Sequence, residues 1–417
     1  ITVSEAIRTS DGELLSVKLK KVESRRRATA FLLVAPLLLF ILIAYIFPIF
    51  QMLIRSVDNT EMSQLLSKTS VVIEKWDGKD FPPEEVTSTF YYELKDLIAN
   101  KNHGKIATRL NYEKGGFTSL IKKTARKLDS FDENGNFLEQ FMDVHKRWKD
   151  IEYWLALKRG TQAYHARKYL TAFDYEQKFD GSIEKIPEKK RINVTLWLRT
   201  IFVAVGVTLC CFLLAYPIAH LLAALPTRYA NLLMICVLLP FWTSLLVRTS
   251  SWMVLLQTQG VLNDILVSIG LVADDNRLEL MYNMTGTFIA MTQILLPFMV
   301  LPLYSVMKTI QPSLMRAAVS MGSTPFNAFR KIYFPLTYPG ISAGSILVFV
   351  LAIGYYITPA LVGGSKGVLI SNRIAYHMQK SLDWGLATAM AAVLLIAVLV
   401  VYWLYNRIVG IDNMRLG

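Results

Sequence analysis

Six polar or aromatic residues lie inside otherwise apolar stretches of the chain, where such side chains are costly and mark functional sites. They are Ser244, Arg248, Trp252, Tyr355, Tyr356 and Thr358. The first three are spaced four residues apart, so they share one face of a helix. An arginine can hold a carboxylate or phosphonate in two-point geometry, and tyrosine faces attract a cation. Together they predict a pathway for a small polar solute with a cationic nitrogen. The alternative reading is that Arg248 and Trp252 anchor the chain at a membrane interface.

The sequence offers no pattern for a catalytic site or a metal site. The cysteines and the histidines considered as ligands are Cys210, Cys211, Cys236, His103, His145 and His165. The cysteines lie inside apolar runs and the histidines are too scattered for a ligand set. The net charge of +13 is spread over short loops and one mixed-charge block, without a basic stripe interleaved with aromatics. We therefore expect no catalytic residue, no metal and no nucleic-acid partner.

Charge is concentrated in one part of the chain. Residues 55–195 hold 25 of the 45 Lys and Arg and 22 of the 32 Asp and Glu, which leaves 30 charged residues for the other 276. The whole chain is 53% hydrophobic and only 18% charged. This division excludes a wholly soluble enzyme and a disordered protein, and it predicts one water-exposed block within an integral membrane protein.

The apolar stretches are long enough for six transmembrane helices, each of which needs roughly 20 residues. They are residues 28–54, 198–225, 229–256, 283–307, 340–362 and 386–409. The first stretch is too long for a signal peptide, and no small-residue cleavage site follows it. Several stretches contain proline, which membrane helices tolerate where neighbours or a lined cavity satisfy the freed backbone. We expect kinked helices around a pathway.

Loop charges predict the orientation. With an internal N-terminus, the inner short segments carry 14 Lys and Arg, whereas the outer short segments carry four. The prediction is a cytoplasmic segment 1–28, a first span 29–54 and an extracytoplasmic insert 55–195. A five-span region 196–410, with an inner loop 308–337, and a cytoplasmic tail 411–417 follow. Both termini would lie in the cytoplasm.

The insert is expected to be mainly helical. The sequence from Pro82 to Glu85 suits a helix start, and an apolar stripe predicts another helix over 137–157. Turns are expected at 115–116 and 134–136. The Tyr and Trp residues of this block are expected to form its core, with a docking face for a partner as the alternative.

The inner loop contains the most specific pattern. Pro312 suits the first turn of a helix, and Gly322 suits the left-handed position after its end. Ser323 or Thr324 can cap a second helix that starts at Pro325. A further proline, Pro335, would end that helix. The small residues Ala317 and Ala318 would let another protein approach closely.

This loop resembles the cytoplasmic loop of binding-protein-dependent ABC importer permeases, in which Glu-Ala-Ala, three residues, Gly, nine residues and Ile-x-Leu-Pro recur. The residues at the matching positions are Arg316, Ala317, Ala318, Gly322, Ile332, Phe334 and Pro335. Arg316 replaces the acidic residue and Phe334 replaces the leucine. The resemblance implies that the loop couples the permease to an ATPase.

Other segments are similar to the spermidine/putrescine-type permeases of this family. They are residues 239–252, 296–304 and 358–364. The resemblance implies an all-α, six-span, type I ABC importer permease in the bacterial inner membrane. It implies as partners a second permease subunit, two ATPase subunits, a periplasmic solute-binding protein and membrane lipid. The chain has no Gly-x4-Gly-Lys-Ser/Thr loop, so ATP and Mg would be bound by the ATPase subunits and this chain would not be an enzyme.

The expected function is import of a small polar amine. Polyamines are the solutes implied by the resemblance, but Tyr355 stands where an acidic residue is expected in polyamine permeases. Opines, amino-acid-like compounds and aminophosphonates therefore stay open. The rival classes are a membrane receptor or sensor that binds a ligand in the insert, and a secondary transporter. A secondary transporter is disfavoured, because the predicted spans contain no carboxylate that could couple transport to an ion.

Overall fold

The computed structural model describes the backbone of residues 15–409 and the side chains of residues 22–407. The predicted tail 411–417 and most of the predicted segment 1–28 lie outside the described residues. The chain divides into two compact units, residues 1–55 and 56–417. The first unit consists of α1 (Leu15–Ile41), a π-helical turn η1 (Leu42–Ile46) and α2 (Phe47–Arg55). Residues Val22–Arg55 are long and apolar enough to cross a membrane, as predicted for 28–54.

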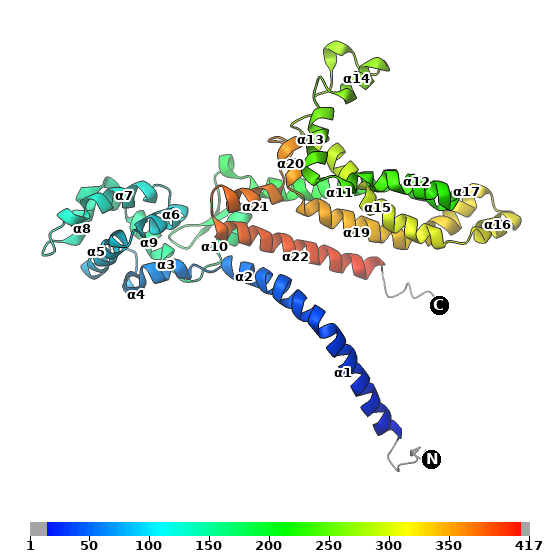
Figure 1. The fold of residues 1–417 in the computed structure, drawn as a ribbon. Coiled ribbons are helices and arrows are strands. Elements are labelled where there is room, and N and C mark those ends of the chain that lie inside the picture. Colours follow the sequence, from blue (N-terminus) through cyan, green and yellow to red (C-terminus); the bar gives the residue numbers. More distant parts are fainter. Residues whose placement is uncertain (1–14, 410–417) are drawn as a thin grey trace. The chain divides into compact units, whose positions relative to one another are not determined.

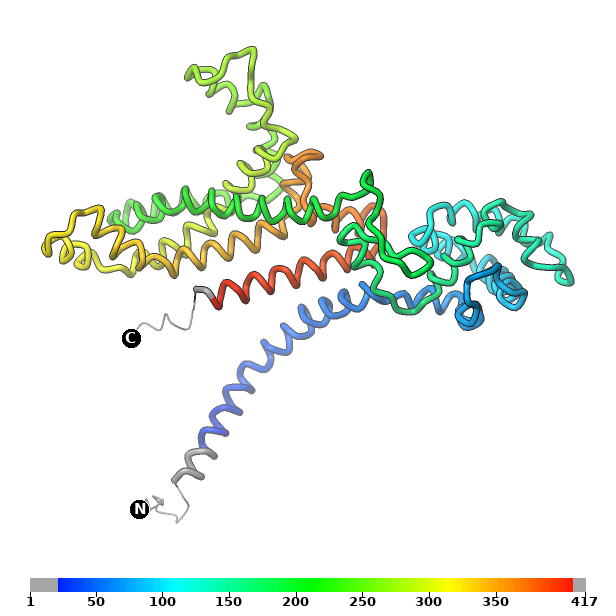
Figure 2. The backbone as a smooth tube through the Cα atoms, turned by 180° about the vertical axis from the view of Figure 1, so that it is seen from behind, coloured from blue at the N-terminus to red at the C-terminus, as the bar shows by residue number. Residues whose placement is uncertain are grey.

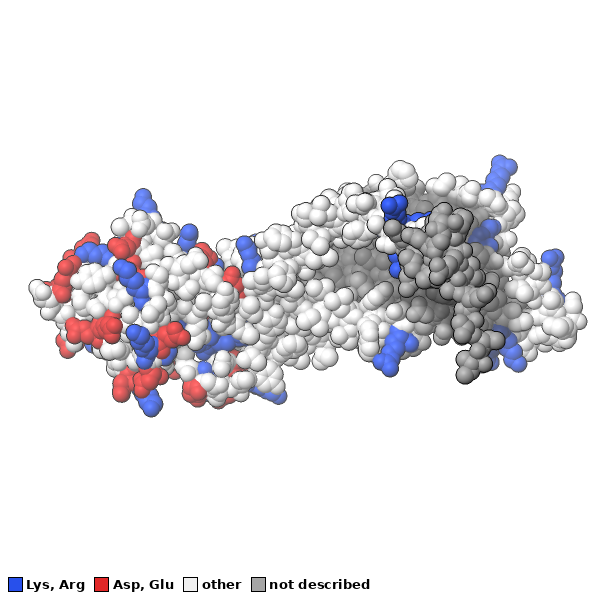
Figure 3. All heavy atoms as spheres, turned by 90° about the horizontal axis from the view of Figure 1, so that it is seen from below, with Lys and Arg blue, Asp and Glu red and all other residues white. Residues whose placement is uncertain are grey.

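The second unit begins with the insert, which is helical apart from one small hairpin. Its helices are α3 (Thr60–Leu65), α4 (Ser67–Lys75), α5 (Glu84–Ala99), α6 (His103–Glu113), α7 (Phe117–Lys127), η2 (Leu128–Ser130), α8 (Phe137–Val144), η3 (Lys146–Lys149), α9 (Ile151–Gly160), α10 (Arg167–Ala172) and η4 (Glu188–Lys190). The antiparallel strands β1 (Tyr175–Gln177) and β2 (Ile183–Lys185) pair with Glu176 opposite Glu184. Figure 3 shows that the acidic side chains gather over this part of the molecule.

The insert has its own aromatic core. Trp148 and Trp154 are fully buried, their ring centroids lie 4.5 Å apart, and Phe90 and Phe141 pack against them. Each indole N–H has a partner, since Trp148 donates to Thr124 Oγ1 and Trp154 donates to the Trp148 carbonyl. The prediction that the Tyr and Trp residues form the core is confirmed for the tryptophans and for Tyr91 and Tyr153, but it is wrong for Tyr92 and Tyr164, which are 47% and 67% exposed. The insert therefore does not depend on disulfides for its packing.

One local prediction for the insert is confirmed and another is wrong. The helix α5 starts at Glu84 behind Pro83, and Gly116 has φ of +104° at the predicted turn. The expected single helix over 137–157 is instead three pieces, α8, η3 and α9. The chain is extended at His145, whose ring accepts from the Arg147 N–H, and again at Asp150, which caps α9. These polar side chains satisfy backbone donors locally and so end the helix despite its apolar stripe.

The rest of the second unit is an assembly of long apolar helices (Figure 1). In chain order they are α11 (Asn193–Ala224), α12 (Thr227–Leu238), η5 (Leu239–Trp242), α13 (Leu245–Leu255), α14 (Val261–Ser268), η6 (Asp274–Asn276), α15 (Met284–Thr309), α16 (Pro312–Ser320), α17 (Pro325–Ala328), the π-helical turn η7 (Phe329–Tyr333), α18 (Phe334–Leu336), α19 (Tyr338–Gly354), α20 (Ile357–Val362), α21 (Ile370–Gln379) and α22 (Trp384–Val409).

Helices α11, α15 and α19 pack against one another and form the centre of this assembly. Small side chains of α11 permit the close approach, and Ala204, Cys211 and Ala215 are fully buried there. On α19, a Cβ at Gly344 would lie 2.6 Å from the sulfur of Met299 on α15. Small residues at such contacts let backbones pack closely where the hydrophobic effect between helices is weak.

Four described helices are long and apolar enough to cross a membrane, and up to six spans result if two bent pairs each count as one. The predicted third span, 229–256, is bent by 99° between Thr227–Trp242 and Leu245–Leu255. The predicted fifth span, 340–362, is interrupted between α19 and α20. These two segments are therefore not continuous helices. The interruptions follow Pro240 and precede Pro359, which agrees with the expectation of proline-associated kinks.

Candidate functional site

Two regions hold the residues singled out in the sequence. One is the inner loop around α16 and α17, and the other is the pair of interruptions next to Ser244 and Tyr355. Figure 2 shows the loop at one end of α15 and α19, whereas the insert adjoins the opposite end of α11.

The inner loop is a tight helix–turn–helix. Gly322 has φ of +90°, its N–H donates to the Val319 carbonyl, and the Ser323 N–H donates to the Ala318 carbonyl. This pair of hydrogen bonds is the Schellman arrangement that ends helices with a left-handed glycine. Thr324 then caps α17, because its hydroxyl accepts from the Asn327 N–H. The predicted turn and cap are confirmed, with Thr324 as the capping residue.

The second helix runs from Pro325 through α17, the π-helical turn η7 and α18 to Leu336, and the chain then bends by 57° into α19. It thus ends one residue after Pro335, as predicted. One detail of the predicted loop is wrong. Ala318 is only 2% exposed, so it packs inward and leaves Ala317 as the accessible small residue. Arg316 is exposed, and Ile332 and Pro335 are half-buried.

The outer surface of this loop is apolar. Met321 is 82% exposed and Phe326 is 72% exposed, on either side of the Gly322 turn. Large apolar side chains presented at a turn are typical of an interaction surface. The sequence analysis did not single out these two residues. Their position next to the predicted Gly322 turn is the signal that could have identified them.

The second region contains the bend of the third predicted span. The chain is extended at Thr243 and Ser244, and the Ser244 hydroxyl accepts from the Val247 N–H as the cap of α13. Arg248 and Trp252 follow on α13, and both are half-buried. Ser244 is exposed, so its role in the structure is to start the helix that positions Arg248.

The interruption between α19 and α20 lies at Tyr355 and Tyr356. Ser371 Oγ donates to the Tyr355 carbonyl at 2.6 Å, and Asn372 Nδ2 donates to the Tyr356 carbonyl at 2.7 Å. Both donors come from the first turn of α21. Helix breaks at membrane depth persist where other protein groups satisfy the freed backbone in this way.

The two interruptions meet. Thr249 of α13 and Thr358 of α20 share a hydrogen bond of 3.1 Å, and both side chains are buried. Tyr355 belongs to the same interruption as Thr358, three residues before it. Trp252 Nε1 donates to Gln293 Oε1 at 3.0 Å, which adds α15 to the group. The structure therefore places Arg248 and Trp252 of α13 next to the interruption that contains Tyr355 and Thr358. A common pathway through these residues stays a prediction.

Two predicted pathway residues do not join this group directly. Among the described residues, the side chains of Ser244 and Tyr356 form no hydrogen bond to Arg248, Trp252 or Tyr355, although the Arg248 N–H donates to the Ser244 carbonyl within α13. Conversely, Thr249 and Gln293 belong to the group and were missed. Gln293 is a lone amide in the middle of an apolar stretch, and that is the signal that could have identified it.

The electrostatics of the group are those of a single unpaired cation. Arg248 Nε is buried and has no hydrogen-bond partner among the residues that the structure describes, and its guanidinium lies 5.8 Å from the Phe241 ring centroid. The three predicted spans 229–256, 283–307 and 340–362 contain no Asp or Glu. The group can thus offer charge-assisted hydrogen bonds to an anionic group, together with aromatic faces for a cation. In the described part of the chain, no cluster of metal-ligating side chains is present.

Long apolar helices, two interrupted spans lined by polar side chains and a helical loop with an exposed apolar turn define a membrane transport protein. Residues 212–410 match the family described as "Binding-protein-dependent transport system inner membrane component". The chain is also 36% identical over 216 residues to the spermidine/putrescine transport system permease protein PotB of Escherichia coli (strain K12), covering 51% of this chain and 78% of that protein. The chain belongs to this family of ABC importer permeases.

Two further similarities accompany this match. The inner membrane ABC transporter permease protein YdcU of Escherichia coli (strain K12) is 34% identical over 194 residues, which is 44% of this chain and 61% of that protein. The crystal structure of a bacterial ABC transporter involved in the import of the acidic polysaccharide alginate aligns with 71% of this chain and 99% of that chain. Its TM-score is 0.49 at 16% sequence identity, a likeness too distant to support an argument.

Membership in the family establishes several expectations of the sequence analysis. The chain is an all-helical, multi-pass inner-membrane permease, and it works with a periplasmic binding protein. It is not catalytic and carries no cofactor of its own, since ATP is bound by a separate ATPase subunit. This assignment replaces the rival readings of a receptor and a secondary transporter. The insert lies outside the matched residues 212–410.

Proposed function

We propose that this chain is the permease subunit of an ATP-driven importer that moves a small, polar, amine-containing solute into the cytoplasm. The observation that carries the proposal is the convergence of Arg248, Trp252, Gln293 and Tyr355 at two interrupted spans. Discontinuous helices at membrane depth recur where transporters bind their solutes. A relative that is 36% identical is named as a spermidine/putrescine permease, which supports an amine as the cargo.

Within that class we favour a zwitterion over a plain polyamine. The tyrosine faces would attract a cationic nitrogen, worth roughly 0.5–2 kcal/mol. Arg248 would hold a carboxylate or phosphonate. A polyamine has no group for Arg248 and would find no carboxylate in the predicted spans around it. Opines, amino-acid-like compounds and aminophosphonates meet both requirements.

We further propose a six-span type I architecture with both termini in the cytoplasm and the insert 55–195 outside. The excess of Lys and Arg in the inner loops supports this orientation. The position of the insert at one end of α11 and of the inner loop at the other end is consistent with it (Figure 2). A second permease subunit and two ATPase subunits complete the proposed complex.

In this complex the loop 308–337 is the contact with an ATPase subunit. The exposed side chains of Met321 and Phe326 and the rigid Gly322 turn support that role. ATP binding between the ATPase subunits would press on α16 and α17 and switch the cavity from inward to outward access. The solute-binding protein would then deliver its cargo at the outer mouth.

The decisive experiment is uptake by the complete transporter reconstituted in vesicles. Spermidine, octopine and 2-aminoethylphosphonate are offered to the wild-type complex and to the Arg248→Gln and Tyr355→Ala variants. We expect the Arg248→Gln transporter to lose its preference for octopine and 2-aminoethylphosphonate over spermidine. The Tyr355→Ala transporter should take up all three compounds more slowly. Arg228→Gln, at the exposed start of α12, is the matched control. Unchanged transport and preference in both variants would assign Arg248 to the membrane interface instead.

The topology is tested independently. A membrane-impermeant amine label, applied to cells with a permeabilised outer membrane, should modify lysines of the insert such as Lys122 and Lys123, which are exposed. It should not modify Lys331 in the inner loop until the inner membrane is opened. The reverse pattern would overturn the orientation.

A further inference from the structure

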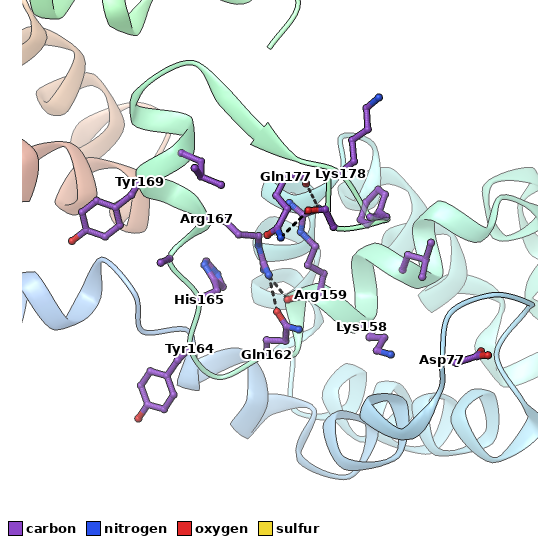
Figure 4. Close-up of a pocket in the computed structure, with 15 residues that line it drawn as sticks. Asp77, Lys158, Arg159, Gln162, Tyr164, His165, Arg167, Tyr169, Gln177 and Lys178 are labelled. Carbon is purple, nitrogen blue, oxygen red and sulfur yellow. Dashed lines mark hydrogen bonds between the residues drawn. The ribbon is translucent and has the colours of Figure 1, made fainter. Parts of the chain in front are cut away.

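The insert contains a cavity of about 770 Å³ that the transport pathway does not use. It lies between α9, the connection 161–166, the start of α10 and the turn of the β1–β2 hairpin (Figure 4). Arg159 and Arg167 lie at its centre, with Gln162 and Gln177 beside them. Small-molecule pockets commonly have volumes of roughly 300–1,000 Å³, so the cavity is large enough for a metabolite.

Positive charge dominates the centre of this cavity. Glu113 of α6 is the carboxylate that pairs with both arginines: its Oε2 lies 3.1 Å from Arg159 Nε and 3.5 Å from Arg167 Nη2. A second carboxylate, Asp77, lines the cavity away from the two arginines (Figure 4). Its other oxygen lies 4.0 Å from His165 Nε2. One carboxylate is thus shared by two guanidinium groups and an imidazole. Lys158 adds a further cation to the lining.

Several polar atoms here lack partners. Arg167 Nε and His165 Nδ1 are buried without a hydrogen bond in the described structure, and their side chains are only 13% and 10% exposed. Buried donors and charges are normally paired, because each unpaired one is costly. Burial and the nearby charges of Arg167, Lys168 and Arg159 also lower the pKa of His165 to about 4, against the opposing effect of Glu113.

We propose that this cavity binds a small oxyanion, a molecule that carries a carboxylate or a phosphate. Such a group would supply the negative charge that Glu113 alone does not, and planar guanidinium groups match its geometry. Other guanidinium donors already hold the walls in place. Arg159 Nη1 donates to the Gln177 carbonyl and Arg167 Nη1 donates to Gln162 Oε1, both at 2.6 Å. The cationic centre is thus preorganised rather than mobile.

A free small molecule fits the cavity better than an acidic side chain of a partner protein. The arginine and histidine side chains are recessed, with exposed fractions of 10–20%. A carboxylate on a folded surface reaches recessed groups less readily than a diffusing anion does. The apolar ring of Phe179, 5.0 Å from the Arg159 guanidinium, completes a lining that suits an organic anion.

The cavity is also joined to the transport helices. Arg167 is the first residue of α10, and the next residue, Lys168, pairs with Asp383 at 2.8 Å just before α22. A ligand held by Arg167 would therefore stiffen the segment that ties the insert to α22. This gives the bound anion a route by which it could influence transport.

The test is calorimetric titration of the full chain in detergent with inorganic phosphate and with succinate, against sodium chloride at matched ionic strength. We expect saturable binding of at least one of the two anions by the wild type. Arg167→Gln should weaken it at least tenfold. Arg126→Gln removes the same charge from an exposed site on α7 and should leave binding unchanged.

The Arg167 variant could lose binding through misfolding, so Lys158→Gln serves as a second variant. Among the described residues, the Lys158 ammonium donates to the Trp76 carbonyl and lies over the Trp76 ring. The substitution should weaken binding at least threefold in a folded protein. The absence of saturable binding of both anions by the wild type would overturn the proposal. The proposal would also be overturned if Lys158→Gln bound the anions with the same affinity as Arg126→Gln. Loss of solute-binding-protein affinity in Arg167→Gln, without any anion binding by the wild type, would assign the cavity to protein docking instead.

Discussion

Ser371 donates its hydroxyl to the carbonyl oxygen of Tyr355, 16 residues earlier in the chain, at a distance of 2.6 Å. That carbonyl is freed where α19 ends, and the interruption places the Tyr355 side chain next to Arg248 and Thr358. The interruption is thus held by α21 rather than by local sequence alone. The geometry of the proposed pathway therefore depends on side-chain donors from the first turn of α21.

Removal of this donor should disturb the pathway. In Ser371→Ala, the partly buried Tyr355 carbonyl loses its partner, which costs about 1 kcal/mol or more of stability. We expect a lower unfolding temperature and slower solute uptake by the reconstituted complex. Ser268→Ala, at an exposed position on α14, is the control. Wild-type uptake in the Ser371 variant would show that α21 does not set the position of Tyr355.

The Gly322 turn can be tested through its backbone alone. A Cβ added at Gly322 meets no atom within 4 Å, so the Gly322→Val substitution causes no clash at Cβ. Valine disfavours the backbone φ of +90°, and this strain costs roughly 1–3 kcal/mol. Docking to the ATPase should weaken, and solute-stimulated ATP hydrolysis should fall while the chain still inserts. Gly104→Val, also in open space but without positive φ, is the control for added bulk. Normal coupled hydrolysis in Gly322→Val would remove the loop from the proposed interface.

Local rules were sufficient for much of the sequence analysis. The starts of α5 and α17 and the left-handed Gly322 follow from capping and turn chemistry within a few residues. These features need no information about distant parts of the chain. The same holds for the apolar stretches, which were predicted from length and composition and mostly appear as long helices.

Tertiary contacts decided the features that the sequence analysis missed. Thr249 and Thr358 lie 109 residues apart and meet only because two interrupted spans cross. Gln293 joins the group through Trp252, and no local pattern connects those two residues. Ala318 is 2% exposed whereas the adjacent Ala317 is exposed, although the two side chains are identical. In each case the outcome depends on packing that spacing rules do not describe.

Acidification should destabilise the insert through His165. The ring faces Glu113, Arg159, Arg167 and Lys168, and its pKa falls from 6.5 to about 4 in the folded state. The unfolded chain therefore binds the extra proton first. The contribution of neutral His165 to the free energy of unfolding is fully present above about pH 6.5. It is lost as the pH falls towards 4, and the loss is at most about 3 kcal/mol.

This dependence can be followed by tryptophan fluorescence during denaturant unfolding, because the insert core contains three buried tryptophans, Trp76, Trp148 and Trp154. Between pH 7 and 5, His165→Gln should show a smaller loss of stability than the wild type. An equal loss in both proteins would mean that His165 is not the titrating group. Burial lowers the pKa of His377 to about 4 as well. His377→Gln should therefore reduce the remaining dependence of the free energy of unfolding on pH.

The ion pair between Lys168 and Asp383 should contribute to both stability and transport. Its side chains are only 15% and 12% exposed, and removal of one partner leaves the other charge poorly solvated. Asp383 also caps α22 through the Leu386 N–H, so Asn is the substitution that keeps the cap. In a double-mutant cycle of Lys168→Met and Asp383→Asn, we expect a coupling free energy of about 1–3 kcal/mol. The exposed pair of Lys178 and Glu184 is the control and should show little coupling, as surface pairs do.

The Lys168–Asp383 pair should also affect transport. Asp383 follows shortly after α21, the helix that holds the Tyr355 carbonyl, so Lys168→Met should slow uptake as well. Coupling no larger than that of the control pair, with unchanged uptake, would show that the insert is not joined to the pathway through this contact.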